Sequence, residues 1–214
     1  MAEGWRLKLR NDLHLARKLW HCGMGTVIVL IYAAGLSKAA SVTILLTAFI
    51  AFSALEVARL RMPGVNGLAV KVFRPIMRQN EVARVTGTPF YVGSVLLSIV
   101  VFPKTIAILS ILFLAIGDPL SSIFGIIYGY KSIRFANGKT LIGTAAGMTV
   151  CFSIAFSYLY FHDQLPAPAA SMIALTGGIA GGGAEMIPLD IDDNFSIPIV
   201  SGLAMWLAYL VLGW

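Results

Sequence analysis

Acidic and basic side chains interrupt a strongly apolar stretch of the chain between residues 114 and 143. Asp118 lies near the end of an apolar run, and Lys131, Arg134 and Lys139 follow it. A carboxylate in hydrocarbon costs roughly 2.5–3.5 kcal/mol on insertion scales, so Asp118 requires a functional reason. The small and hydroxyl residues around it could supply oxygen ligands or let a helix or a nucleotide approach closely: Gly117, Ser121, Ser122, Gly125 and Gly129. The segment predicts a site for a metal-bound polyphosphate.

Two later segments could complete such a site. Asn137-Gly138-Lys139-Thr140 precedes an apolar span, so free backbone N–H groups, a lysine and a hydroxyl would form a phosphate cradle. A simple turn and helix cap is the alternative, and the strand and spacing of a P-loop are missing. The second segment is an acidic loop with the hard oxygen ligands that suit Mg²⁺, and its polar members are Glu185, Asp190, Asp192, Asp193 and Asn194. An ordinary acidic loop is the alternative there.

Charged residues near the first two apolar spans are further candidates. A helix would bring Arg17 and His21 together one turn apart, where with Lys18 they could grip phosphates. A basic anchor at the membrane surface is the alternative for Arg17 and Lys18. Glu56 and Arg59 are three residues apart, so one helix face would carry both as an ion pair, with either a structural or a site role.

The elements that must position these residues are membrane helices. Hydrophobic residues make up 58% of the chain, charged residues 12%, and the mean hydropathy is +0.84, which excludes a soluble globule of this size. At roughly 20 residues per crossing, the sequence predicts one all-α domain over residues 1–214 with seven spans. They are 20–37, 40–58, 89–103, 105–129, 140–161, 168–187 and 195–213. Six crossings with one re-entrant segment is the alternative, because the third and sixth spans are short or interrupted by glycine.

The charges predict the orientation. With the N-terminus in the cytoplasm, seven crossings put all Lys and Arg residues except Lys38 and Lys104 on the cytoplasmic side, as the positive-inside rule requires. All acids except Asp163 fall on the same side or in its half of the bilayer. The amphipathic segment 78–91 is expected along the membrane surface. The site should therefore face the cytoplasm, with the bilayer as its partner. No nucleic-acid partner is expected, and no oligomeric state is predicted.

In combination, these motifs resemble the CTP-dependent lipid kinases, a family that includes the fungal-type CTP-dependent diacylglycerol kinase, dolichol kinase and phytol kinase. The matching pieces are Arg17-Lys18-x-x-His21, Glu56-x-x-Arg59, residues 78–93, Gly117-Asp118 with Gly125 and Gly129, Asn137-Gly138-Lys139-Thr140 with Gly143, and Asp192-Asp193-Asn194-x-x-x-Pro198. Ile142 stands where phytol and related kinases often carry a glutamate, so the chain looks closer to the diacylglycerol kinase branch.

The resemblance implies an enzyme that transfers the γ-phosphoryl group of CTP to the hydroxyl of a membrane lipid alcohol. Diacylglycerol is the favoured substrate, and polyprenol, dolichol or phytol are the others. The membrane would be a bacterial inner membrane or the endoplasmic reticulum. Two alternative functions stay open. One is a phosphatidate cytidylyltransferase, which uses CTP, Mg²⁺ and a lipid but transfers the nucleotidyl group. The other is a transporter, in which residues 177–183 would break a helix. Acids at one membrane face and the absence of matching repeats argue against transport.

The resemblance also implies roles for individual residues. Asp118 would hold Mg²⁺ on the nucleotide phosphates. Asp192 and Asp193 would bind a second metal or orient and deprotonate the lipid hydroxyl. The charges that neutralise phosphate oxygens would be those of Arg17, Lys18 and Lys139. Residues that recognise the base or support the site would be His21, Glu56, Arg59 and Asn194, and the nucleotide would also approach Gly117, Ser121, Ser122, Gly125, Gly129, Asn137 and Thr140.

Overall fold

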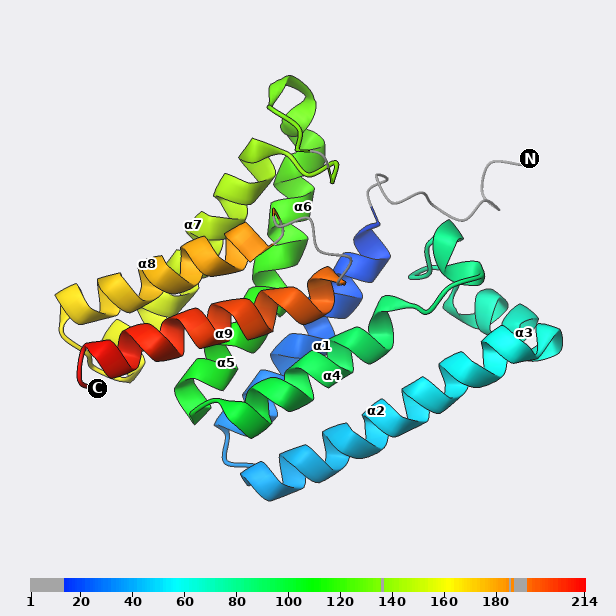
Figure 1. Cartoon of the computed structure of the whole chain (residues 1–214), viewed down its shortest axis with the longest axis horizontal. Helices are drawn as coiled ribbons and strands as arrows, with labels where there is room; N and C mark the ends of the chain where they lie inside the picture. Colours follow the sequence, from blue (N-terminus) through cyan, green and yellow to red (C-terminus); the bar gives the residue numbers. More distant parts are fainter. Residues whose placement is uncertain (1–13, 136, 185, 187–191) are drawn as a thin grey trace.

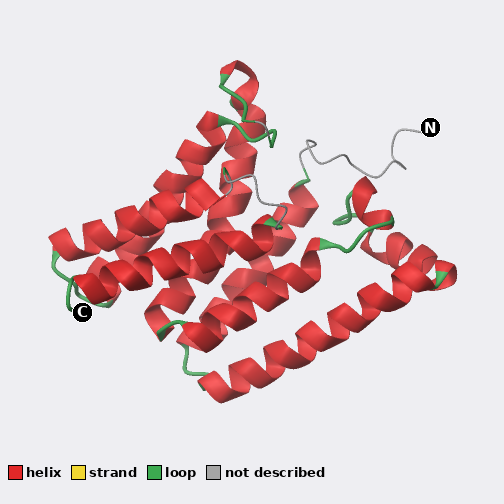
Figure 2. Cartoon of the chain, viewed as in Figure 1, coloured by secondary structure: helices red, strands yellow, loops and turns green. Residues whose placement is uncertain are grey.

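The protein is built from α-helices (Figure 2). The structure, a computed structural model, describes residues 14–135, 137–184, 186 and 192–214, and in these ranges the only β-type pairing is an isolated bridge between Arg134 and Thr140. The helices are α1 (Leu15–Ala33), α2 (Lys38–Arg61), α3 (Pro63–Phe73), α4 (Gly87–Val101), α5 (Lys104–Leu112), α6 (Asp118–Ile127), α7 (Leu141–Ser157), α8 (Ala167–Ala184) and α9 (Asp193–Val211). The predicted all-α class is confirmed.

The apolar spans predicted from the sequence correspond to helical segments. Four of these segments among the described residues are long and apolar enough to cross a membrane: Lys38–Arg61, Lys104–Ile127, Leu141–His162 and Asp193–Val211. A shorter apolar helix covers Gly87–Val101. The chain is therefore an integral membrane protein, while the number of seven crossings stays a prediction.

Two elements differ from the expectation for the region between the second and third spans. Helix α3 was not predicted, and it starts at Pro63, whose fixed φ and missing N–H suit the first helical position. The segment expected along the membrane surface forms a 3₁₀ turn, Gln79–Val82, and then a bend that leads to Thr86, whose hydroxyl accepts the N–H of Thr88 at the start of α4. Its placement relative to a bilayer stays a prediction.

The centre of the fold is the segment α5–α6, which runs as one helix with a widened π-helical turn at Phe113–Gly117. Ala107, Leu109, Ile111 and Phe113 are fully buried along it. Helices α7, α8 and α9 cover one side, with α8 and α9 running side by side, while α1 and α4 cover another and α2 lies outside α4 (Figure 1).

Helix α8 is continuous through its glycine-rich stretch. A Cβ at Gly182 would lie 3.0 Å from the backbone nitrogen of Met148, and one at Gly181 would lie 3.1 Å from the ring of Phe113. The glycines therefore let α8 pack closely against its neighbours. The broken helix that a transporter interpretation requires is not formed, so that part of the alternative is wrong.

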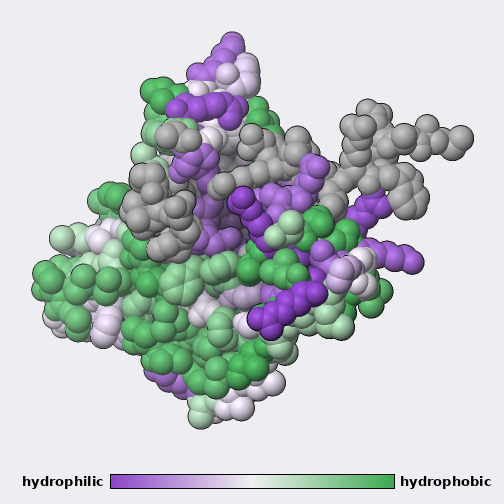
Figure 3. All heavy atoms as spheres, turned by 45° about the vertical axis from the view of Figure 1, so that its right-hand side comes forward, coloured by the Kyte–Doolittle hydropathy of each residue, from purple (hydrophilic) through white to green (hydrophobic). Residues whose placement is uncertain are grey.

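Polar residues gather at one end of this bundle. On the face in Figure 3, hydrophilic residues surround a recess in the upper middle, and hydrophobic residues cover the lower part. In Figure 1 the start of α1 and the start of α9 lie close together beside the lower part of α6. Several of the sequence-predicted site residues come from these elements, while Glu56 and Arg59 lie on α2 and Asn137, Lys139 and Thr140 lie in the turn before α7.

Candidate active site

Asp118 is positioned by the π-helical turn before it. The backbone N–H of Asp118 bonds to the carbonyl of Phe113, five residues back, so the helix is wider here than a regular α-helix. Pro119 explains the widening, because its ring would clash with the carbonyl four residues earlier and it has no N–H to donate. Such π turns often occur at functional sites because they redirect a side chain.

Lys139 is positioned by a tight turn before α7. Gly138 has φ +84°, a conformation that favours glycine. The side-chain oxygen of Asn137 accepts the N–H of Lys139 at 3.1 Å, and the hydroxyl of Thr140 accepts the N–H of Gly143 at 3.2 Å, which caps the helix. The turn and cap named as the alternative is thus what the backbone forms, and it directs the lysine inwards.

Lys139 joins two carboxylates from different helices. Its Nζ lies 3.0 Å from Asp193 Oδ2 and 4.0 Å from Asp118 Oδ1. The three side chains are 21%, 31% and 20% exposed, respectively, for Lys139, Asp193 and Asp118. We call these three residues the Lys139 cluster. It brings together two acids that are far apart in the sequence and leaves them accessible to solvent.

The start of α9 is fixed against α4. Asp192 caps α9, because its Oδ1 accepts the N–H of Asn194 at 2.9 Å. Asn194 is buried, its amide donates to the carbonyl of Gly87 at 3.3 Å, and its own carbonyl accepts the hydroxyl of Ser94 at 2.7 Å. Burial raises the pKa of Asp192, and the nearby Asp193 charge acts in the same direction, while the Asn194 N–H opposes both. The contacts give Asp192 and Asn194 a clear structural role beside any role at the site.

The predicted basic group on α1 contacts three other segments. Lys18 Nζ donates to Ser122 Oγ on α6 at 2.6 Å. Arg17 Nη1 lies 2.9 Å from each carboxylate oxygen of Glu81. The ring of His21 packs edge-on against Tyr91, with 4.8 Å between the ring centroids. Arg17 and His21 lie in one helix as predicted, but Arg17 is held by an acid, which ties α1 to the segment before α4.

Two residues in this region were not assigned to the site from the sequence. The charge of Lys18 interacts with those of Asp118, Lys139 and Arg78, so Arg78 belongs to the same group of charges. Glu81 pairs with Arg17 and also accepts the backbone N–H of Arg78 at 2.9 Å. The spacing of Arg78 and Glu81 was visible in the sequence, but the partner Arg17 lies 64 residues away from Glu81.

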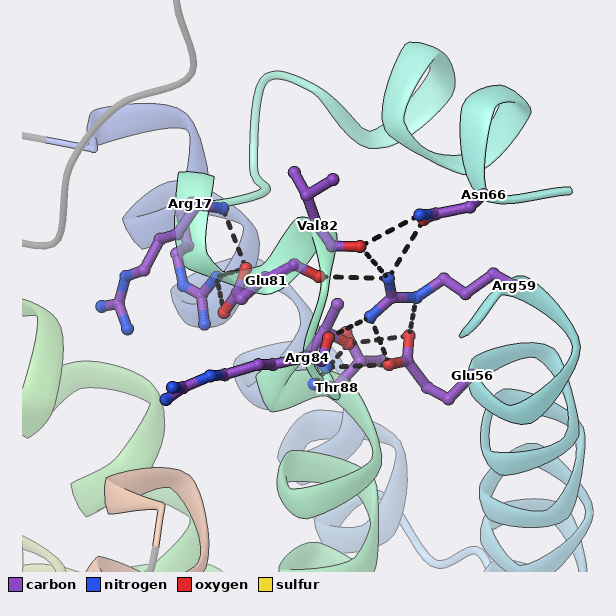
Figure 4. A network of polar contacts seen from close by, with 10 residues as sticks. Arg17, Glu56, Arg59, Asn66, Glu81, Val82, Arg84 and Thr88 are labelled. Atoms are coloured by element: carbon purple, nitrogen blue, oxygen red, sulfur yellow. Dashed lines mark hydrogen bonds and ion pairs between the residues drawn. The ribbon is translucent and has the colours of Figure 1, made fainter. Parts of the chain in front are cut away.

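Glu56 and Arg59 form a second, buried cluster (Figure 4). Arg59 Nε and Nη2 bond to the two Glu56 oxygens at 2.8 and 2.6 Å. Its remaining donors reach the side chain of Asn66 on α3 and backbone carbonyls of the segment 81–84. Glu56 in turn accepts the N–H and hydroxyl of Thr86. We call Glu56, Arg59 and Asn66 the Arg59 cluster. It fastens α2 and α3 to the start of α4, while the side chain of Arg84 points away from it (Figure 4).

The glycines predicted near the nucleotide pack against other helices. A Cβ at Gly117 would lie 2.6 Å from the sulfur of Cys151, and one at Gly125 would lie 3.4 Å from the Cα of Gly143. Gly129 faces the side chain of Thr140 in the same way. Ser121 is buried against Gly147 on α7. Close helix approach accounts for these small residues, so a direct nucleotide contact stays a prediction. Glu185 and Asp190 lie outside the described residues.

The carboxylates of the site fit a metal ion that is held partly by substrate phosphates, and not one held by protein side chains alone. Among the described residues, no group of three or more His, Cys, Asp or Glu side chains is arranged to hold a metal ion. Mg²⁺ in phosphate chemistry is usually held by one or two carboxylates together with substrate phosphates and water. Asp118 and Asp193, which share one lysine, fit this arrangement of carboxylates, phosphates and water. The site suits a metal that arrives with a nucleotide.

Comparison with known proteins agrees with this picture. The chain is 28% identical over 208 residues to the CTP-dependent diacylglycerol kinase 1 of Saccharomyces cerevisiae, covering 89% of this chain and 72% of that protein. It is 28% identical over 206 residues to the protein of the same name in Schizosaccharomyces pombe, covering 90% and 92%. It is also 25% identical over 211 residues to the chloroplastic farnesol kinase of Arabidopsis thaliana, covering 92% and 66%.

No family model and no solved structure matches the chain. These matches cover about nine tenths of the chain. On these matches, the chain fits the CTP-dependent lipid kinase family.

Proposed function

We propose that this protein transfers the γ-phosphoryl group of CTP to the hydroxyl of a membrane lipid alcohol, with diacylglycerol as the favoured acceptor. The observation that carries the proposal is the Lys139 cluster, where one lysine joins carboxylates from α6 and α9 beside the α1 cation Lys18. The names of the yeast relatives support CTP as donor and diacylglycerol as acceptor.

The chemistry suits a site built from charges. Phosphoryl transfer needs little covalent participation by the protein, so catalysis rests on positioning and charge stabilisation. The lipid hydroxyl oxygen attacks the γ-phosphorus, the bond to the β,γ-bridging oxygen breaks, and CDP leaves. In this proposal Lys139 and Lys18 neutralise phosphate oxygens. When Lys139 turns to the nucleotide it releases Asp193, and whichever of Asp192 and Asp193 does not hold the metal accepts the proton of the hydroxyl.

Asp118 has the other central role. Its carboxylate, with that of Asp193 or Asp192, would hold Mg²⁺ brought with the nucleotide, and the bound metal would neutralise charge that develops on the phosphate oxygens. Arg17 and Arg78 add positive charge at the edge of the site, and Glu81 keeps Arg17 in place. We assign Glu56 and Arg59 to support of the segment before α4, at one remove from the nucleotide.

The site is proposed to face the cytoplasm. Arg17, Lys18 and Lys139, which the structure brings to the site, are basic residues that the positive-inside rule assigns to the cytoplasmic side. The proposal also requires that CTP reaches the site from the cytoplasm. A lipid hydroxyl lies at the membrane surface, close to the helix starts that carry Asp192 and Asp118. The single domain over residues 1–214 belongs to the same proposal.

A product assay tests the function. Purified protein is incubated with CTP labelled at either the α or the γ phosphate, with ATP as the competing donor, and with diacylglycerol, polyprenol or phytol. We expect the γ label in a phospholipid and CDP as the second product. Pyrophosphate and a CDP-lipid would contradict the proposal and establish a cytidylyltransferase. Substrate uptake by liposomes without CTP turnover would instead support a transporter.

A further inference from the structure

An apolar groove of about 580 Å³ lies between α2 and α4. Its lining contains no polar side chain. The lining residues are Val42, Leu46 and Phe49 on α2, Pro89, Phe90, Gly93, Leu96, Leu97 and Val100 on α4, and Phe195 on α9. At Gly93 the backbone of α4 comes close to α2, since a Cβ there would lie 3.0 Å from the ring of Phe49. The volume is that of a small-molecule site.

The groove runs along most of α4. From Pro89 to Val100, at about 1.5 Å per residue, its length is roughly 16 Å. One leaflet of a bilayer has roughly the same depth, half of the approximately 30 Å hydrocarbon thickness. At its far end the ammonium group of Lys38 bonds to the carbonyl of Val100 at 2.9 Å. The groove therefore ends where the polar groups of the opposite end of the bundle begin.

The near end of the groove and the candidate active site meet at the start of α9, where Phe195 and Asp193 lie on different faces of the first turn. Phe195, which lines the groove, follows Asn194 in the first turn of α9. The Asn194 amide bonds to the carbonyl of Gly87, two residues before the lining residue Pro89. Asp193, which pairs with Lys139, lies two residues before Phe195. The wall of an apolar groove and a site of charged groups thus share one helix start.

We propose that this groove holds one hydrocarbon chain of the lipid acceptor and so presents the lipid hydroxyl to the start of α9. The inference rests on the proposed function and adds the binding path of its substrate. A chain in the bilayer already lies in hydrocarbon, so the groove gains little from the hydrophobic effect. Its contribution is position: it holds the hydroxyl near Asp193, which is where orientation accelerates a reaction.

Two substitutions on α2 test the groove. Leu46→Trp adds bulk to a lining residue, whereas Ile44→Trp adds the same bulk to a neighbour that is outside the lining and comparably exposed, at 57% against 44%. Residues two positions apart on a helix, such as 44 and 46, point to nearly opposite faces. We expect Leu46→Trp to lower kcat/KM for a long-chain diacylglycerol at least tenfold relative to Ile44→Trp. The KM for CTP should not change. With the short-chain acceptor dihexanoylglycerol, Leu46→Trp should lower kcat/KM by a smaller factor than with the long-chain lipid. Equal activity of the two variants would overturn the proposal.

Photo-crosslinking separates this inference from the proposed function. A diacylglycerol with a diazirine near the end of one chain should label residues 42–49 and 89–100 of the wild type, and excess diacylglycerol should compete. Labelling elsewhere, or labelling that does not compete, would mean ordinary bilayer lipid and would refute the groove. A dimer that Leu46→Trp dissociates would refute it in favour of a second protein copy. A wild type that labels correctly but phosphorylates no lipid would refute only the proposed function.

Discussion

The Arg59 cluster and the Lys139 cluster both pair a cation with acids at the same end of the molecule, yet they differ in what they leave accessible. Arg59 is 1% exposed and its three nitrogen groups all have acceptors within the protein. Lys139 is 21% exposed, and among the described contacts its ammonium group lies 4.0 Å from Asp118 and 3.0 Å from Asp193.

This difference separates a structural ion pair from a site that can bind a ligand. The partners of Arg59 are near in sequence or are backbone carbonyls of the segment it holds, so a ligand would have to replace several bonds at once. Lys139 holds two carboxylates from separate helices, and phosphate oxygens together with a cation could replace that arrangement without leaving a buried charge unpaired. Because all donor groups of Arg59 are bonded within the protein, we assign the Arg59 cluster to structural support. Because one lysine is shared by two carboxylates, we assign the Lys139 cluster to a candidate catalytic site.

The largest effect is expected from Asp118→Asn, which removes one charge from the Lys139 cluster and keeps the shape of the side chain. CTP-dependent phosphorylation should fall about 10²–10³-fold, the size typical for losing one charge-stabilising group in an active site. The melting temperature in detergent should be nearly unchanged. The matched control is Asp163→Asn at the other end of the bundle, where Asp163 pairs with His162 and Thr105. Near-normal turnover of Asp118→Asn would remove Asp118 from the site.

Arg59→Met should act on stability instead. It leaves the Glu56 carboxylate buried without its cation, which typically costs about 3–5 kcal/mol, so thermal unfolding should shift strongly downward. Adding Glu56→Gln in a double variant should restore part of the loss, because the unpaired charge is then removed. If Arg59→Met melted like the wild type but lost affinity for CTP, the assignment of Arg59 to support would be refuted.

Lys139→Met should have the smaller effect on turnover, because Lys18 also lies near the phosphates in our proposal. Loss of one charged hydrogen-bonding partner, about 1.5–3 kcal/mol, corresponds to roughly a 10- to 100-fold decrease in kcat/KM. Lys38→Met is the matched control, since Lys38 bonds only a backbone carbonyl at the opposite end among its described contacts. Steady-state kinetics on Lys139→Met and Lys38→Met measure this difference. Equal decreases in kcat/KM for the two variants would contradict a catalytic role that is specific to Lys139.

The sequence was informative where a pattern is local. Apolar runs predicted the helical segments, and the turn and cap at Asn137-Gly138-Lys139-Thr140 was the alternative interpretation of that motif, because φ preferences and capping act over a few residues. The sequence did not reveal that Arg17 pairs with Glu81, because that contact depends on how α1 packs against the segment before α4. It also left the role of Glu56 and Arg59 open, since saturation of Arg59 needs carbonyls more than 20 residues away.

Protection of lysines by CTP tests the central claim most directly, because it reports where the nucleotide binds without requiring turnover. The purified protein is acetylated with a limiting amine-reactive reagent, with and without CTP and Mg²⁺, and each lysine is quantified by peptide mass spectrometry. Our account predicts that CTP slows acetylation of Lys139 several-fold and leaves Lys104, whose Nζ lies near the Ala33 carbonyl at the opposite end, unaffected. An unchanged rate at Lys139, or equal protection of both lysines, would contradict it.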